Sequence, residues 1–171
     1  IISRPVHPDG NPENCSGTTT GVTEIDRWIG NVKWDLIHFN FGLHDIKHVD
    51  PKTGNSSSKP EDPLQADLKK YIANMEKITD VLLKTGSKLI FATTTPVPLN
   101  VTNPLREPGN VIKYNKAAMK IMRRKNIEVN DLYSFVLSHL EEIQLKRNVH
   151  FNEEGYKKLA GVVADKISRY L

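Results

Sequence analysis

The chain has 171 residues, of which 38% are hydrophobic and 26% are charged, and its net charge is +4. This length and composition indicate one globular domain without an apolar run long enough for a membrane span. The lysines and arginines are scattered along expected helix faces, which favours solvated surfaces over a nucleic-acid patch. A single cysteine, Cys15, excludes an internal disulfide and an all-cysteine metal site, and a small buried or loop residue is a better explanation than a nucleophile.

The expected elements alternate between helices and short apolar strands. In chain order they are a helix at 23–29, a strand at 34–40, a helix at 64–84, a strand at 88–93, a helix at 111–125, a strand at 127–130 and a helix at 154–170. This alternation predicts an α/β fold in which a parallel sheet is covered by helices on both faces. Residues 50–63, rich in Gly, Ser and Pro, are expected to form a mobile surface loop within a single domain that spans residues 1–171.

In parallel sheets the functional site forms from loops at the carboxyl ends of the strands. Residues 14–21 (NCSGTTTG) form the first such loop and combine glycines with small hydroxyl side chains. A backbone N–H group in this loop could donate to a developing oxyanion. The alternative is an ordinary helix N-cap at Thr20 or Thr23.

The second candidate loop, Gly42-Leu43-His44-Asp45, follows the expected strand at 34–40. His44 could donate a hydrogen bond to an anion or carry a proton, and the alternative is a turn in which Asp45 caps the segment that follows. His44 and His48 have a metal-ligand spacing, but no HExxH motif or cysteine partner supports a metal, so we expect none. His38 is expected to be a satisfied core residue.

The third candidate is His150, which lies just ahead of the last expected helix, with Asn152 as the predicted N-cap. A loop histidine held beside a rigid helix start suits general-base work on a hydroxyl nucleophile. The alternative is an ordinary surface histidine.

Taken in this order, the loops resemble the SGNH/GDSL hydrolase superfamily, in a bacterial branch with Gly-Leu-His-Asp in place of Gly-x-Asn-Asp that is similar to carbohydrate esterases. The resemblance implies a three-layer flavodoxin-like fold. It also implies that Gly17 is the oxyanion glycine, that His44 and Asp45 occupy the Asn-Asp positions, and that His150 is the catalytic base. If His44 were charged, it would stabilise the oxyanion more strongly, and activity would fall as the pH rises.

Two parts of the family pattern are missing. The Gly-Asp-Ser block does not occur, so we expect an N-terminally incomplete domain without its first strand, a nucleophile on another polypeptide, or a non-catalytic relative. Ser3 and Ser16 are poor substitutes for the absent serine. Arg147 stands where an acid should orient His150, so the imidazole is expected to be held by a backbone carbonyl, by Asn148 or by an acid from elsewhere.

The resemblance implies an ester hydrolase that works by serine acyl transfer on short acyl groups, such as acetyl esters of a carbohydrate. The alternatives are a non-catalytic carbohydrate-binding or interaction module of the same fold and, less favoured, a nucleotide binder. We expect no cofactor, nucleic-acid partner or membrane partner, and no hydrolysis by residues 1–171 alone. The polar side chains expected to line an acceptor site are Asn14, Asn40, Thr95 and Tyr114.

The first residues, Ile1 and Ile2, are not part of a basic-then-apolar leader and indicate a mature or trimmed terminus. The sequence therefore leaves the compartment open, although the carbohydrate-esterase resemblance favours a periplasmic or secreted protein. It also leaves the oligomeric state open.

Overall fold

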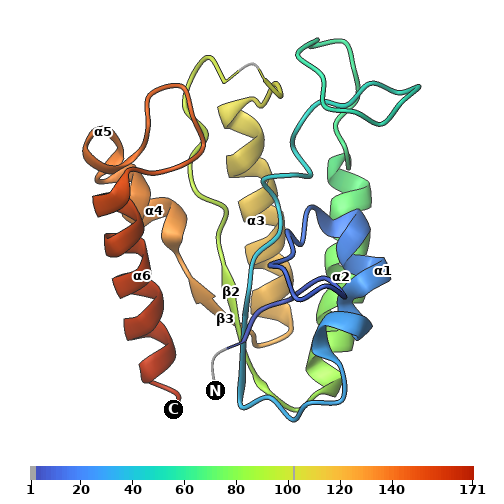
Figure 1. Cartoon of the computed structure of the whole chain (residues 1–171), viewed down its shortest axis with the longest axis vertical. Coiled ribbons are helices and arrows are strands. Elements are labelled where there is room, and N and C mark those ends of the chain that lie inside the picture. The colour runs from blue at the N-terminus through green and yellow to red at the C-terminus, as the bar shows by residue number, and fades with distance from the viewer. Residues whose placement is uncertain (1–2, 102) are drawn as a thin grey trace.

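The computed structural model describes residues 3–101 and 103–171 and contains a three-stranded parallel sheet. The strands are β1 (Leu36–Phe39), β2 (Lys88–Ala92) and β3 (Glu128–Asn130), in the spatial order β1-β2-β3. Figure 1 shows that the connecting helices run back along the sheet, so all three strands end at the same edge. The predicted α/β fold with a parallel sheet is confirmed.

The main core lies between the sheet and three helices, α1 (Thr18–Ile29), α2 (Leu68–Lys84) and α3 (Pro108–Arg124). On α2, Tyr71, Met75 and Ile78 recur at helical spacing and are fully buried, which explains why this helix packs along one stripe. Helix α1 approaches α2 closely at Gly21, where an added Cβ would lie 2.8 Å from the Ile78 Cδ1 atom. This close contact holds the start of α1 against the sheet.

The opposite face carries α6 (Glu153–Ser168), with α4 (Leu132–Leu137) and α5 (Leu140–Ile143) beside it. Val136, Ile143 and Phe151 form a second, smaller core there. Only Gly155 of α6 is fully buried, and the far end of α6 is joined to the sheet by an ion pair between Lys166 and Glu128 (2.5 Å). This face of the sheet is therefore covered more thinly than the other.

Several element boundaries differ from the sequence prediction. Helix α1 begins at Thr18 and not at 23, so the expected N-caps at Thr20 and Thr23 are wrong. Helix α2 begins at Leu68 and not at 64, because the Asp67 side chain accepts from the Lys70 N–H (2.7 Å) and caps it. The short helices α4 and α5 were not predicted.

The loop at 50–63 is mostly exposed, but backbone hydrogen bonds at Ser57 fix its middle. Ser57 is buried, its N–H donates to the His48 carbonyl, and its own carbonyl accepts from the Leu105 N–H (both 2.9 Å). The loop is thus attached to the chain segment that follows β2. Among the helices of the described residues, none is both long and apolar enough to cross a membrane.

Candidate active site

The loop before α1 is held by a carboxylate from a distant part of the chain. Asp45 Oδ1 accepts from the Thr18 backbone N–H (2.8 Å) and from the Thr18 hydroxyl. An added Cβ on Gly17 would lie 2.7 Å from Gln65 Nε2 and 3.1 Å from Asp45 Oδ1, so only glycine fits without movement. Gly17 is buried, and its N–H donates to no acceptor among the described residues.

Asp45 therefore caps the helix that precedes it in the chain, and the expectation that it caps the following segment is wrong. The helix N-terminus is favourable for an acidic group, and Thr18 supplies two donors. Burial nevertheless dominates and raises the pKa of Asp45 to about 6. Its Oδ2 atom has no partner among the described residues.

The turn after β1 is locked to the end of β2. The Asn40 amide donates to the Ala92 carbonyl (2.7 Å), and Gly42 has a φ of 151°, which favours glycine. An added Cβ on Gly42 would collide with Thr94 Oγ1. Thr94 in turn exchanges two hydrogen bonds with the Asn115 side chain (2.8 and 2.9 Å).

His44 follows this turn and is half-buried. Its imidazole forms no hydrogen bond with a described residue. Burial, followed by the positive charges of Lys47 and Arg106, lowers the pKa of His44 to about 4. The ring is therefore uncharged at neutral pH and carries one N–H donor. The hypothesis of a charged His44 therefore does not apply at neutral pH.

His150 lies in an antiparallel hairpin of residues 144–152, here named the His150 hairpin. The His150 Nδ1 atom lies 2.7 Å from Asn148 Oδ1, which also accepts from the His150 backbone N–H (3.1 Å). An amide oxygen only accepts, so Nδ1 carries the proton and Nε2 is left with its lone pair. Three partners were expected to hold the His150 ring, and the one found in the structure is the Asn148 side chain.

Two anchors place the His150 hairpin. The buried Gln144 side chain donates to the Pro96 carbonyl (2.8 Å) in the loop after β2. At the other end Asn152 accepts from the Gly155 N–H (2.8 Å), which confirms it as the N-cap of α6. Arg147 is exposed and has a φ of 54°. Sequence reasoning missed Gln144, for which no local pattern gives a signal.

The structure joins Gly17 to Asp45 through Thr18, and it brings the loops after all three strands to one edge of the sheet. No hydrogen bond among the described residues joins His150 to Gly17 or His44. Of the expected acceptor side chains, Asn14 and Asn40 are exposed and Thr95 is half-buried. Tyr114 lies in the core with its hydroxyl donating to the Ala66 carbonyl (2.7 Å), so that expectation is wrong.

Two of the three histidines near β1 have hydrogen-bond partners of their own. His38 Nε2 lies 3.3 Å from the Asn130 amide, and His48 Nδ1 lies 2.6 Å from the Asp62 carbonyl oxygen. In the part of the chain that the structure describes, no group of three or more His, Cys, Asp or Glu residues could hold a metal ion.

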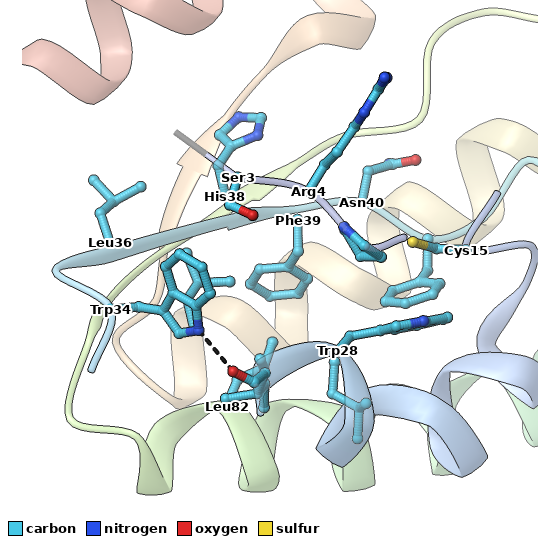
Figure 2. A pocket seen from close by; sticks show the side chains of 15 residues that line it. Ser3, Arg4, Cys15, Trp28, Trp34, Leu36, His38, Phe39, Asn40 and Leu82 are labelled. Carbon is cyan, nitrogen blue, oxygen red and sulfur yellow. Dashed lines mark hydrogen bonds between the residues drawn. The ribbon is translucent and has the colours of Figure 1, made fainter. Parts of the chain in front are cut away.

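A groove of about 270 Å³ runs along the outer edge of β1. It is lined by Ser3–Pro5 on one side and by β1 and α1 on the others, with Trp28 and Cys15 among the wall residues (Figure 2). Within residues 3–101 and 103–171, β1 pairs with β2 alone, so its other edge faces this groove. Burial raises the pKa of the Cys15 thiol, which disfavours the thiolate.

Comparisons with known proteins agree with the fold. A model of the GDSL-like lipase/acylhydrolase family matches residues 5–158. The structure of a lipase/acylhydrolase from Enterococcus faecalis is 18% identical with a TM-score of 0.70, covering 89% of this chain and 70% of that one. No curated protein matches the chain.

Two similar structures are acetyl xylan esterases. AlAXEase is 15% identical with a TM-score of 0.72, covering 92% of this chain and 79% of that one. A catalytic mutant of Axe2 from Geobacillus stearothermophilus is 16% identical with a TM-score of 0.70, covering 92% and 70%. At these identities the likeness shows the fold, and it confirms the expected SGNH-type fold. The three-stranded sheet fits such a fold without its first strand.

Proposed function

Because the chain belongs to the GDSL-like lipase/acylhydrolase family, we propose that it carries the base and the oxyanion donors of an ester hydrolase that works by serine acyl transfer. The observation that carries this proposal is the state of His150. Asn148 holds its Nδ1 side, and the ring is exposed with Nε2 free to accept a proton.

In the proposed reaction, Nε2 of His150 takes up and returns a proton while Nδ1 stays bonded to Asn148. A serine oxygen attacks the ester carbonyl carbon while its proton passes to His150 Nε2. The oxyanion then accepts from the Gly17 N–H and from the neutral His44 ring. Collapse breaks the bond to the alcohol oxygen, which takes the proton from His150. Water repeats the cycle on the acyl-serine and releases the acid.

We place the nucleophile outside residues 1–171, since no serine hydroxyl among the described residues forms a hydrogen bond with His150. Ser3 lines the groove along β1, and Ser16 has a φ of 52° in the loop before α1, with its N–H bonded to Asn14 Oδ1 (2.9 Å). We place the serine on a strand beside β1, because that edge is unpaired among the described residues and the groove lies along it. The similar structures are longer than this chain, which leaves room for such a strand.

Short acyl esters of a carbohydrate are the substrates we propose, because two similar structures are acetyl xylan esterases. The test uses the complete gene product with p-nitrophenyl acetate and an acetylated xylo-oligosaccharide. We expect turnover of both, and a loss of kcat on the order of 1,000-fold in His150→Ala. Residues 1–171 alone should release no acetate. Full activity in His150→Ala would overturn the assignment of the base.

One observation favours a second candidate, a non-catalytic carbohydrate-binding module of the same fold. An amide, Asn148, stands where a carboxylate would stabilise the imidazolium, so His150 lacks that support. A complete gene product that binds xylo-oligosaccharides but releases no acetate from them would establish this candidate and exclude the esterase.

A further inference from the structure

Arg106 is a buried cation without an acidic partner. Its side chain is only 7% exposed, and its Nε atom donates to the Leu43 carbonyl oxygen (2.9 Å), directly before His44. No carboxylate among the described residues forms an ion pair with Arg106. Arginines are rarely buried without a counter-charge, because the loss of hydration is costly.

Lys47 and His44 share this environment. Lys47 is half-buried, and its Nζ atom has one long contact to Ser56 Oγ (3.5 Å). Burial and then the charge of Arg106 lower the pKa of Lys47, and both cations act on His44. The His48 N–H donates to the Leu105 carbonyl oxygen (3.0 Å), and Arg106 Nε donates to the Leu43 carbonyl oxygen, so residues 43–48 and 105–106 lie side by side next to the proposed oxyanion loop.

The acidic residues nearest in sequence, and Asp62 beyond them, have other partners. Asp45 accepts from Thr18 at the start of α1, Asp50 accepts from the backbone N–H groups of Lys52 and Thr53, and Asp62 accepts from the Ser57 hydroxyl. Glu107 accepts from the Asn110 amide (2.7 Å) in the first turn of α3. The positive charges of Lys47 and Arg106 are therefore not neutralised within the fold.

We propose that Arg106 and Lys47 form a subsite for a carboxylate group of the ester substrate, next to His44. The planar guanidinium matches a carboxylate, and an ammonium beside it adds a second charge-assisted donor. This inference rests on the proposed function, since it makes the substrate an anionic ester. The carboxylate can belong to the alcohol, as in a uronic acid, or to a dicarboxylic acyl group.

The test is a titration of the 171-residue chain, followed by amide chemical shifts in NMR. Sodium glucuronate probes a carboxylate on the alcohol, and monomethyl succinate probes one on the acyl group. Methyl glucoside and methyl acetate are the neutral counterparts. We expect an acidic probe to shift the amide signals of residues 43–47 and 105–107. Its Kd should be at least tenfold lower than that of its neutral counterpart, and about tenfold corresponds to 1.4 kcal/mol of binding free energy. The probe that binds more tightly identifies the part of the substrate that carries the charge.

Three variants make the result specific. Lys47→Gln and Arg106→Gln should each weaken binding of the acidic probe about tenfold, whereas Lys113→Gln, an exposed lysine on α3 with the same change of charge, should not. If Arg106→Gln does not fold, the effect of Lys47→Gln on binding of the acidic probe is the test of the subsite. Equal binding of acidic and neutral probes, or equal losses in Lys47→Gln and Lys113→Gln, would overturn the subsite. Binding is measured without turnover, so failure of this inference and failure to hydrolyse esters are separate results.

Discussion

The two halves of the proposed site are held in different ways. Gly17 and His44 lie in loops fixed by buried groups, with Asp45 capping α1 and Thr94 packed under Gly42. Residues 145–148 and His150 itself are exposed at the tip of the His150 hairpin, and the histidine is oriented by a single amide, that of Asn148. The difference indicates that the proposed oxyanion donors are preorganised by the core, whereas the proposed base depends on local contacts at the surface.

This comparison has a direct consequence for mutations. Changes in the oxyanion loops should reduce the stability of the whole domain, because their contacts are part of its core. Changes at the exposed Asn148 and His150 should reduce activity and leave the fold almost intact. The variants below test that separation, beginning with the largest expected loss of stability.

Gly42→Ala should be the most damaging. The new Cβ would collide with Thr94 Oγ1, and the φ of 151° is unfavourable for alanine. We expect the free energy of unfolding to fall by about 3 kcal/mol, the sum of overpacking and backbone strain. Urea denaturation followed by circular dichroism measures the effect.

Gly161→Ala is the matched control. Gly161 lies inside α6, and an added Cβ there meets nothing within 4 Å. Alanine is the better helix former, so this variant should gain up to about 1 kcal/mol. Similar stabilities of the two variants would show that the turn after β1 is not as tightly packed as the structure has it.

Asp45→Asn should change how stability depends on pH. The pKa of Asp45 is raised from 3.8 to about 6 in the folded state, so the folded form binds this proton more tightly than the unfolded form. The resulting stabilisation is complete below pH 3.8 and is lost as the pH rises through 6. We expect the wild type to lose about 3 kcal/mol from this group between pH 3.5 and pH 7.5. Asp45→Asn should lack that loss, as measured by urea denaturation at several pH values.

Charges around Asp45 come from several elements. Lys70 of α2 lowers its pKa, while burial and then the Asp45 carboxylate raise the pKa of Tyr71 and Tyr114. Asp9→Asn serves as a control, because Asp9 is fully exposed and hydrogen bonds from Asn11 lower its pKa, which gives a small effect of opposite sign. A pH profile of Asp45→Asn that parallels the wild type would contradict the assignment.

Local patterns in the sequence predicted most of the fold. The three strands lie within the predicted ranges, and the N-cap at Asn152 was found because it and the N–H that it accepts from, that of Gly155, are three residues apart. The start of α1 was missed because its cap, Asp45, is 27 residues away in the chain. A cap supplied by tertiary structure leaves no signal near the helix itself.

Local patterns and the family resemblance also indicated part of the candidate site, but not all of it. Gly17, His44 and His150 were found from loop position and family resemblance, and these lie in the expected loops. Asn148 was one of three partners predicted for His150, and the sequence alone could not show which of the three forms the hydrogen bond. Arg106 and Gln144 were not foreseen, because their importance comes from burial against distant carbonyl groups.

Asn148→Ala should separate activity from stability most cleanly. The lost bond to His150 Nδ1 is exposed, so unfolding should be easier by at most about 1 kcal/mol. In the complete gene product, kcat for p-nitrophenyl acetate should fall roughly tenfold, because the ring no longer keeps one orientation and tautomer. Asn148→Asp keeps an acceptor at that place and should retain activity. Lys146→Ala, another exposed change in the same hairpin, should leave kcat as it is. Equal losses in Asn148→Ala and Lys146→Ala would mean that the hairpin as a whole, and not the Asn148 amide, positions the base.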